Sequence, residues 1–276
     1  MSAVRREFVK TLFQKRTYIG WAGLFIIPWL ISIAFRFSSG GPGQQQGGGS
    51  ADQGEQFFEL IRTNGMYVTV VALIAMATFF LPLLSSMSGS YSVAGEAENG
   101  TLRSMLMQPI RRGTFLMAKW FVANLYVAIG LLIMGISALI AGGAFFGLDP
   151  ITLFSGQTVG VWHGLGLTAV SYLFVFVGMM AVVSLAVFFS TLTNSSLTAV
   201  AGALVLTIIM LALQAFAVFD FLQPYLFPHH FQAWLGFFES PVDWDPIIKA
   251  LINFVVWIVG MTGLAYLRFR HKDILS

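Results

Sequence analysis

The chain has 276 residues, of which 57% are hydrophobic and only 10% are charged. Soluble proteins carry about 25% charged residues, so this composition excludes a water-soluble enzyme, and it equally excludes a collagen-like, coiled-coil or disordered chain. The sequence contains no cysteine, which excludes disulfides, a thiol nucleophile and Cys-ligated zinc.

Long charge-free runs predict membrane-spanning helices, because a span needs about 20 apolar residues. The run 150–219 is long enough for two spans, and the polar stretch 190–196 divides it. We therefore expect an all-α polytopic membrane protein, a single transmembrane domain over residues 1–276. The six expected spans are 18–37, 66–89, 114–147, 163–189, 197–219 and 248–267. Pro28 and Pro82 lie inside spans and predict kinks.

The distribution of charge predicts the orientation of these spans. Of the 15 lysines and arginines, 12 lie before the first span, between the second and third, or after the last, whereas 8 of the 12 acids lie on the other side. The positive-inside rule then places both termini on the cytoplasmic side of the cell (inner) membrane. A cleaved signal peptide is the competing interpretation, but no convincing cleavage site follows Ala34, which favours a retained first span.

Three connections have a character of their own. Segment 3–16 carries Val4, Phe8, Leu12 and Phe13 near one helical face, which predicts a basic amphipathic helix on membrane lipid; a solvated basic tail is the alternative. Loop 38–56 is rich in Gly and Gln and predicts a flexible outer loop, an insertion rather than a substrate flap. Segment 220–247 is aromatic and punctuated by proline, so we expect two short helices re-entering the outer leaflet, with simple interfacial anchoring as the alternative.

The connection between the second and third spans, residues 96–112, carries the most information. Asn99-Gly100 indicates a turn, and Thr101 is a candidate helix cap. Three apolar residues then follow at helical spacing, and a proline ends the pattern: Leu102, Met105, Leu106 and Pro109. Such a short amphipathic helix must place its apolar face against lipid headgroups, the bundle itself or a soluble partner.

This connection resembles the hallmark of the permease subunits of type-2 ATP-binding-cassette (ABC) exporters. The shared pattern is Glu-x-Glu-x-Gly-Thr-Leu, a short hydrophobic helix, Pro-x-x-Arg, then Ala-Lys at the start of a span. The matching residues are Glu96, Glu98, Gly100, Thr101, Leu102, Leu106, Pro109, Arg112, Ala118 and Lys119. The order of spans and connections is similar too, whereas Arg103 and the long first outer loop depart from the family pattern.

The resemblance implies that segment 96–112 is a coupling helix that docks on a separate ABC ATPase subunit. The coupling residues would be Glu96, Glu98, Gly100, Thr101, Leu102, Met105, Leu106, Pro109 and Arg112. The chain contains no G-x-x-x-x-G-K-[ST] motif, so ATP and Mg²⁺ are expected on the partner and no cofactor in this chain. A second permease copy would complete the assembly, as a homodimer or a paralogous heterodimer.

The spans themselves offer few polar groups. Asn124, Gln214 and Asn253 are candidate residues of a substrate pathway, although hydrogen bonds between packed helices are the more ordinary role for them. An apolar and aromatic pathway favours export of a hydrophobic or amphipathic cargo such as a drug, antibiotic, lipid or lipopeptide. Lys119 is expected to reach the cytoplasmic headgroups. We expect no catalytic residue, no metal site and no nucleic-acid partner.

Two other classes stay open. A polytopic membrane enzyme would need a motif such as H-E-x-x-H, which is absent, and Glu96 and Glu98 lie in a cytoplasmic loop rather than at membrane depth. An ion-coupled carrier would need ionisable groups within the spans, against the charge-free run 150–219. A non-transporting scaffold or immunity subunit is the remaining alternative.

Overall fold

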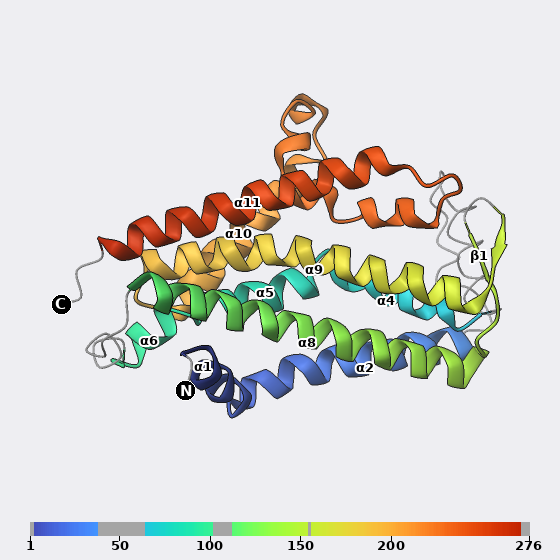
Figure 1. Ribbon diagram of the computed structural model, residues 1–276, viewed down its shortest axis with the longest axis horizontal. Helices are drawn as coiled ribbons and strands as arrows, with labels where there is room; N and C mark the ends of the chain where they lie inside the picture. The colour runs from blue at the N-terminus through green and yellow to red at the C-terminus, as the bar shows by residue number, and fades with distance from the viewer. Residues whose placement is uncertain (1–2, 38–63, 102–111, 154–155, 272–276) are drawn as a thin grey trace.

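The protein is a bundle of long helices, seen here in a computed structural model that describes residues 3–37, 64–101, 112–153 and 156–271 (Figure 1). Five described helices are long and apolar enough to cross a membrane, and a bent helix pair makes a sixth candidate. The expected fold class, an all-α polytopic membrane protein, is confirmed.

Nine α-helices are described along the chain. They are α1 (Ala3–Leu12), α2 (Lys15–Phe37), α4 (Met66–Ala77), α5 (Phe80–Ser90), α6 (Ala94–Glu98), α8 (Arg112–Phe146), α9 (Val161–Leu192), α10 (Ser196–Leu213) and α11 (Trp244–Arg270). Two short antiparallel strands, β1 (Ile151–Thr152) and β2 (Thr158–Val159), pair between α8 and α9, with Ile151 opposite Val159. Helices α1 and α6 lie at one end of the bundle, beside the C-terminal end of α11, and we call this the α6 end; the strands lie at the other end (Figure 1).

The second span, expected at 66–89, is broken into α4 and α5, which meet at 57°. Pro82 is the third residue of α5, and it has no N–H to donate to the carbonyl of Thr78 four residues earlier. The helix therefore breaks at residues 78 and 79, and the carbonyl of Phe79 begins the next ladder by accepting from the N–H of Leu83 at 3.0 Å. Pro28, by contrast, lies within the continuous helix α2.

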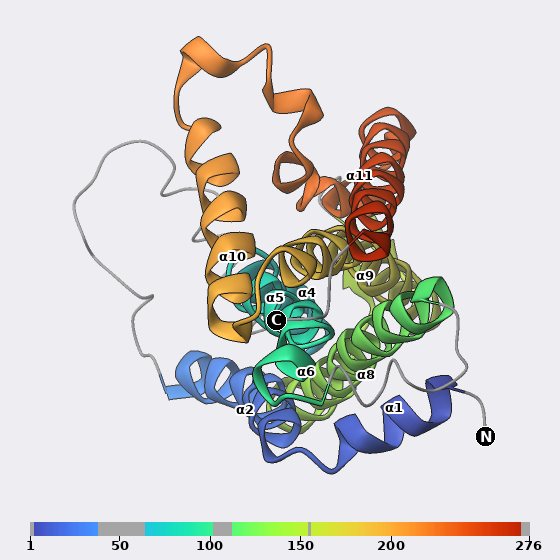
Figure 2. The ribbon, with the colours of Figure 1, turned by 90° about the vertical axis from the view of Figure 1, so that its left-hand side faces the viewer.

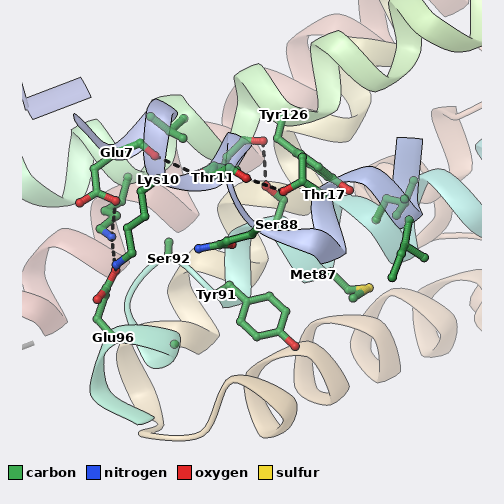
Figure 3. Close-up of a pocket in the computed structure, with 18 of the residues that line it drawn as sticks. Glu7, Lys10, Thr11, Thr17, Met87, Ser88, Tyr91, Ser92, Glu96 and Tyr126 are labelled. Carbon is green, nitrogen blue, oxygen red and sulfur yellow. Dashed lines mark hydrogen bonds and ion pairs between the residues drawn. The ribbon is translucent and has the colours of Figure 1, made fainter. Parts of the chain in front are cut away.

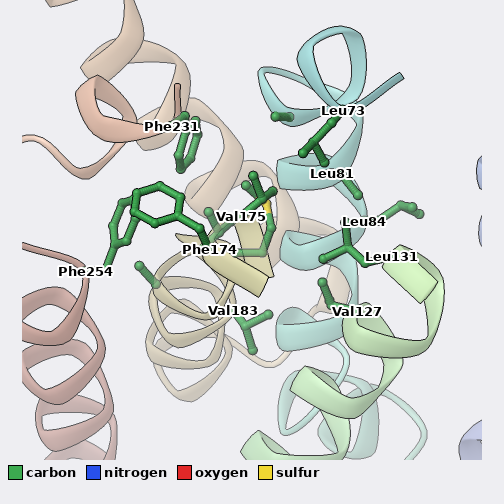
Figure 4. Packing of buried hydrophobic residues seen from close by; sticks show 14 of the residues in the cluster. Leu73, Leu81, Leu84, Val127, Leu131, Phe174, Val175, Val183, Phe231 and Phe254 are labelled. Atoms are coloured by element: carbon green, nitrogen blue, oxygen red, sulfur yellow. The ribbon is translucent and has the colours of Figure 1, made fainter. Parts of the chain in front are cut away.

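Helix α9 lies in the middle of the bundle and packs against α5, α8, α10 and α11 (Figure 2). Its residues 181–187 are all buried. Gly89 of α5 allows the closest approach, since a Cβ there would lie 2.7 Å from both the Cβ of Ala186 and the carbonyl oxygen of Val183. Figure 4 shows how Val183 and the Phe174–Phe254 contact belong to one apolar core with side chains of α4, α5 and α8.

The connection from α10 to α11 differs from the two short helices expected over 220–247. It contains four 3-10 helices, η1 (Ala217–Phe219), η2 (Gln223–Tyr225), η3 (Phe227–His230) and η4 (Ala233–Phe238). Pro224 and Pro228 stand in the first turns of η2 and η3, where they remove donors that longer helices would use. Helix α10 also ends at Leu213, six residues before the expected end. The expected end is too late because it follows the apolar composition, which continues past the last residue of the helix.

Candidate functional site: the anchored start of the coupling segment

The segment 96–112 leaves the bundle at the α6 end, and the structure describes its first six residues and Arg112. Leu102, Met105, Leu106 and Pro109 lie outside the described residues. The site is therefore built from α6 and the groups that hold it.

Helix α6 ends in a Schellman turn, which accounts for two residues of the sequence motif. Gly100 adopts a φ of +67°. Its N–H donates to the carbonyl of Ala97 at 3.1 Å, and the N–H of Thr101 donates to the carbonyl of Glu96 at 3.0 Å. A Cβ on Gly100 would meet nothing within 4 Å. The glycine is thus required by its left-handed backbone rather than by crowding.

Glu96 lies at the centre of four alternating charges, Glu7, Lys10, Glu96 and Lys119, which we call the charge network (Figure 3). The Oε1 atom of Glu96 lies 2.5 Å from Nζ of Lys10 and 2.7 Å from Nζ of Lys119. Its Oε2 atom accepts a hydrogen bond from the hydroxyl of Thr101. The Nζ atom of Lys119 also lies 2.5 Å from Oε2 of Glu7. The network therefore joins α1, α6 and α8.

The surroundings of Glu96 keep it ionised. Burial by itself would raise the pKa of this carboxyl, but the nearby Lys119 ammonium and hydrogen bonds from Lys10, Lys119 and Thr101 lower it to about 2. The carboxylate form is favoured because three donors converge on it, and together they outweigh the effect of burial. Glu96 is therefore ionised at neutral pH.

The expectation that Lys119 reaches the lipid headgroups is wrong. Its side chain is only 6% exposed and is held between the carboxylates of Glu7 and Glu96. A buried ammonium is costly unless it is paired, and here two acids from different helices pair with it. Glu96 is likewise turned into the bundle, so its part at this site is to position α6 and not to present a charge at the surface.

The second acid of the motif holds a different helix. The Oε2 atom of Glu98 accepts from the backbone N–H of Ser196 at 2.9 Å and also from its hydroxyl. Ser196 is the first residue of α10, where backbone donors lack partners within the helix and a negative charge is favourable. Glu98 thereby ties the end of α6 to the start of α10.

Serine 190 of α9 holds the other end of α6. Its hydroxyl oxygen accepts from the backbone N–H groups of Val93 at 3.0 Å and Ala94 at 2.7 Å, and the same hydroxyl donates to the carbonyl of Ser90 at 2.7 Å. These bonds satisfy donors at the beginning of α6. Both ends of this five-residue helix are therefore fixed to the bundle.

Arg112, where the chain re-enters the described structure, contacts the last turn of α11. Its Nη1 atom donates to the carbonyl of Arg270 at 3.1 Å. A cation is favourable at this end of a helix, where carbonyl groups lack partners. The rings of Phe115 and Phe269 stack one turn deeper, with centroids 5.9 Å apart. The far end of the segment is thus joined to both α8 and α11.

Comparison with known proteins shows to which family the chain belongs. A sequence model described as ABC-2 family transporter protein matches residues 3–274. The chain belongs to the ABC-2 transporter family. It is similar to the probable ABC transporter permease protein NosY of Stutzerimonas stutzeri, with 31% identity over 38% of this chain and 36% of the relative. It is also similar to NosY of Pseudomonas aeruginosa, with 37% identity over 24% of each chain. These matched segments span about a third and a quarter of the relatives' own length.

Family membership, together with the long apolar helices, makes this chain a multi-pass protein of the ABC-2 transporter family. In the described part of this ABC-2 permease, no group of three or more His, Asp or Glu side chains could hold a metal ion. The interactions at this site are ion pairs and helix caps, and they fix α6 to the neighbouring helices.

The structure does not bring the three polar pathway candidates of this ABC-2 permease together. Asn124 of α8 is buried, and its amide donates to the carbonyl of Trp120 one turn earlier at 2.8 Å. Gln214 stands at the end of α10, and Asn253 of α11 donates to the carbonyl of Pro224 at 2.9 Å. Each amide donates to a backbone carbonyl, which belongs to its own helix for Asn124 and Gln214 and to η2 for Asn253.

A cavity of about 360 Å³ lies beside the charge network of the permease, between α1, α2, α5, α6 and α8 (Figure 3). None of the three pathway candidates lines it. Sequence reasoning also missed Glu7, Lys10, Ser190 and Ser196 as partners of the motif. Only Glu7 gave a signal, as the single acid in the otherwise basic segment 3–16.

Proposed function

We propose that this permease subunit couples ATP hydrolysis by a separate ABC ATPase to export of a hydrophobic or amphipathic molecule, with the ATPase docking on segment 96–112. ATP and Mg²⁺ would be bound by the partner. The partner can shift an inward-facing to outward-facing equilibrium only by binding the two states of segment 96–112 with different affinity.

The attachment of α6 is the observation that carries this proposal. Glu96 connects α6 to α1 and α8, Ser190 connects it to α9, and Glu98 connects it to α10. At the other end of the segment, Arg112 contacts α11. A displacement applied to the intervening residues would therefore be passed to five helices through short, charged or backbone hydrogen bonds.

The proposed orientation places the α6 end on the cytoplasmic side of the cell membrane. The basic residues of α1 and the end of α11 lie at this end, as the positive-inside rule requires. Two copies of the subunit, identical or paralogous, would enclose the pathway. The apolar side chains of the long helices favour an apolar or amphipathic cargo over an ion, since charged residues are absent from 150–219.

The proposal is tested by co-expressing the chain with the ATPase encoded beside it and measuring how much ATPase is recovered with the purified permease. Leu102→Asp places a charge on the apolar face of the segment and should abolish recovery. Phe13→Asp is the matched control, because Phe13 is also at the α6 end and exposed, but follows α1 and lies outside the segment. Equal recovery with both variants would contradict docking on 96–112.

A further inference from the structure

The cavity beside the charge network has charged side chains at one end and mostly apolar side chains elsewhere, with Thr17, Ser88 and Tyr126 among them. Lys10, Glu96 and Ser92 line the end nearest α1 and α6, whereas Leu84 and Val122 line the part between α5 and α8. At about 360 Å³ the cavity falls within the size range of ligand pockets. This division of its walls fits an amphiphile and would suit neither a wholly apolar molecule nor a free ion.

The cavity is also open to the surroundings of the bundle. Ile19 of α2 lines it and is 73% exposed. Helix α1, which is basic and amphipathic, lies across the α6 end (Figure 2), and its Lys10 lines the cavity. In a membrane this position corresponds to the headgroup layer, with the apolar part of the cavity facing the acyl chains. A lipid from the adjoining leaflet could enter without crossing the protein.

The polar end offers donors rather than acceptors. Both oxygens of the Glu96 carboxylate already accept, from Lys10, Lys119 and Thr101, and Glu7 accepts from Lys119. Lys10 has the most exposed side chain of the network, at 41%, and an ammonium can donate three hydrogen bonds. Two acidic and two basic side chains line this end, so binding of an anionic group would depend on the remaining donors of Lys10.

Ser92 supplies the second observation. It is only 6% exposed and lines the cavity, and its hydroxyl oxygen finds no hydrogen-bond partner among the residues that the structure describes. Figure 3 shows it on the same side of the cavity as Lys10 and Glu96. A buried hydroxyl without a partner is costly. The hydroxyl oxygen is enclosed in this structure, and rotation of the side chain toward the cavity would let a ligand oxygen satisfy it.

We propose that this cavity binds one phospholipid, with its phosphate against Lys10 and Ser92 and one acyl chain between α5 and α8. This binding goes beyond the proposed function, because it requires neither a bound ATPase nor transport of the lipid. It would place a lipid in contact with α1, α5, α6 and α8, beside the charge network that positions α6.

The test is native mass spectrometry of the full-length permease in detergent, titrated with phosphatidylethanolamine and, separately, with diacylglycerol of the same chains. We expect one saturable phosphatidylethanolamine and weaker binding of diacylglycerol, which lacks the phosphate. Lys10→Gln should weaken phosphatidylethanolamine binding about tenfold, as expected for one charge-assisted hydrogen bond. Lys249→Gln is the control, an exposed lysine of α11 far from the cavity. Inorganic phosphate should not displace the lipid.

A second variant blocks the apolar part. Ala123→Trp fills the cavity from α8 and should abolish saturable binding, whereas Ile136→Trp, on the same helix but exposed, should not. Because Ala123→Trp can disturb packing, a photoactivatable phosphatidylethanolamine provides an independent reading on the unaltered protein. Its saturable adducts should map to α2, α5 and α8 around the cavity. Equal affinity for diacylglycerol, an unaltered Lys10→Gln protein, or saturable adducts confined to other surfaces would each overturn the proposal.

Discussion

Lys119 and Glu96 form an ion pair inside the α6 end of the bundle, with Nζ and Oε1 2.7 Å apart and both side chains 6% exposed. Removing Lys119 would leave Glu96 paired with Lys10 alone and would take away the ion-pair partner of Glu7. Loss of one partner from a buried pair typically costs about 3 kcal/mol. Lys119→Met should therefore lower the thermal stability of the purified permease clearly, as measured by its unfolding temperature in detergent.

The control for this prediction is an exposed ion pair with a similar N–O distance. Lys249 and Asp245 lie 2.5 Å apart, but their side chains are 66% and 69% exposed. Exposed pairs contribute roughly 0–1 kcal/mol, so Lys249→Met should change the unfolding temperature little. If the two substitutions were equally harmless, the charge network would not be the element that holds α1, α6 and α8 together.

The network also predicts a dependence of stability on pH. The pKa of Glu96 is lowered to about 2 from an ordinary value of 4.5. A carboxyl with a lowered pKa stabilises the fold fully above its unfolded-state pKa and loses this contribution as pH falls through its folded-state pKa. The stability difference between the natural protein and Glu96→Gln should therefore be constant from neutral pH to about 4.5 and shrink toward pH 2.

This difference is measured by unfolding both proteins across the acidic range in the same detergent. Subtracting one curve from the other removes the titration of the remaining carboxyls. A difference that changes between pH 6 and 8, or that is undiminished at pH 2, would contradict the assignment of Glu96 as the buried, ionised centre of the network.

Gly100 provides a way to separate backbone strain from docking. Its φ of +67° disfavours any β-branched residue, and space around it is open, so Gly100→Val should strain only the turn, at a cost of about 1–2 kcal/mol. Since this turn directs the chain into the rest of segment 96–112, we expect reduced recovery of the ATPase, measured by co-purification. Gly100→Asn should be tolerated better, because asparagine enters the left-handed region more readily.

Gly156 is a matched control for that substitution. It has a φ of +81° and equally open surroundings, but lies at the other end of the bundle, between β1 and β2. Gly156→Val carries a comparable backbone strain and should leave recovery of the ATPase unchanged. A similar loss with both valine variants would assign the effect to general destabilisation.

Topology can be checked directly because the natural chain has no cysteine. Gln45→Cys should react with a membrane-impermeant thiol reagent added to intact cells, and Lys272→Cys should react only after the cells are opened. The reverse pattern would place the α6 end outside the cell and remove segment 96–112 from any cytoplasmic ATPase.

The sequence predicts the long apolar helices well because helix-length charge-free runs have one stable form in a bilayer. The break at residues 78–79 also follows from Pro82, once its missing donor is assigned to the carbonyl four residues earlier. The turn at Asn99-Gly100 is correctly predicted because it depends only on these two neighbouring residues. These features depend on residues close together in the chain.

The remaining parts of the site depend on contacts between distant segments. Lys10 is 86 residues from Glu96, and Ser196 is 98 residues from Glu98, so no spacing rule connects them. The sequence motif identifies Glu96 and Glu98, but it does not show that their side chains contact the bundle rather than a partner protein. The end of α10 was missed for a related reason, since apolarity marks what can be buried and not where a helix stops.

The claim that an external ATPase docks on segment 96–112 is tested most directly by site-specific photocrosslinking in the assembled complex. A photoreactive amino acid at position 102 or 106 should crosslink to the nucleotide-binding subunit, whereas one at position 13 or 156 should not. Crosslinks to that subunit from position 13 alone, or none from 102 and 106 in a complex that hydrolyses ATP and moves its cargo, would contradict the claim.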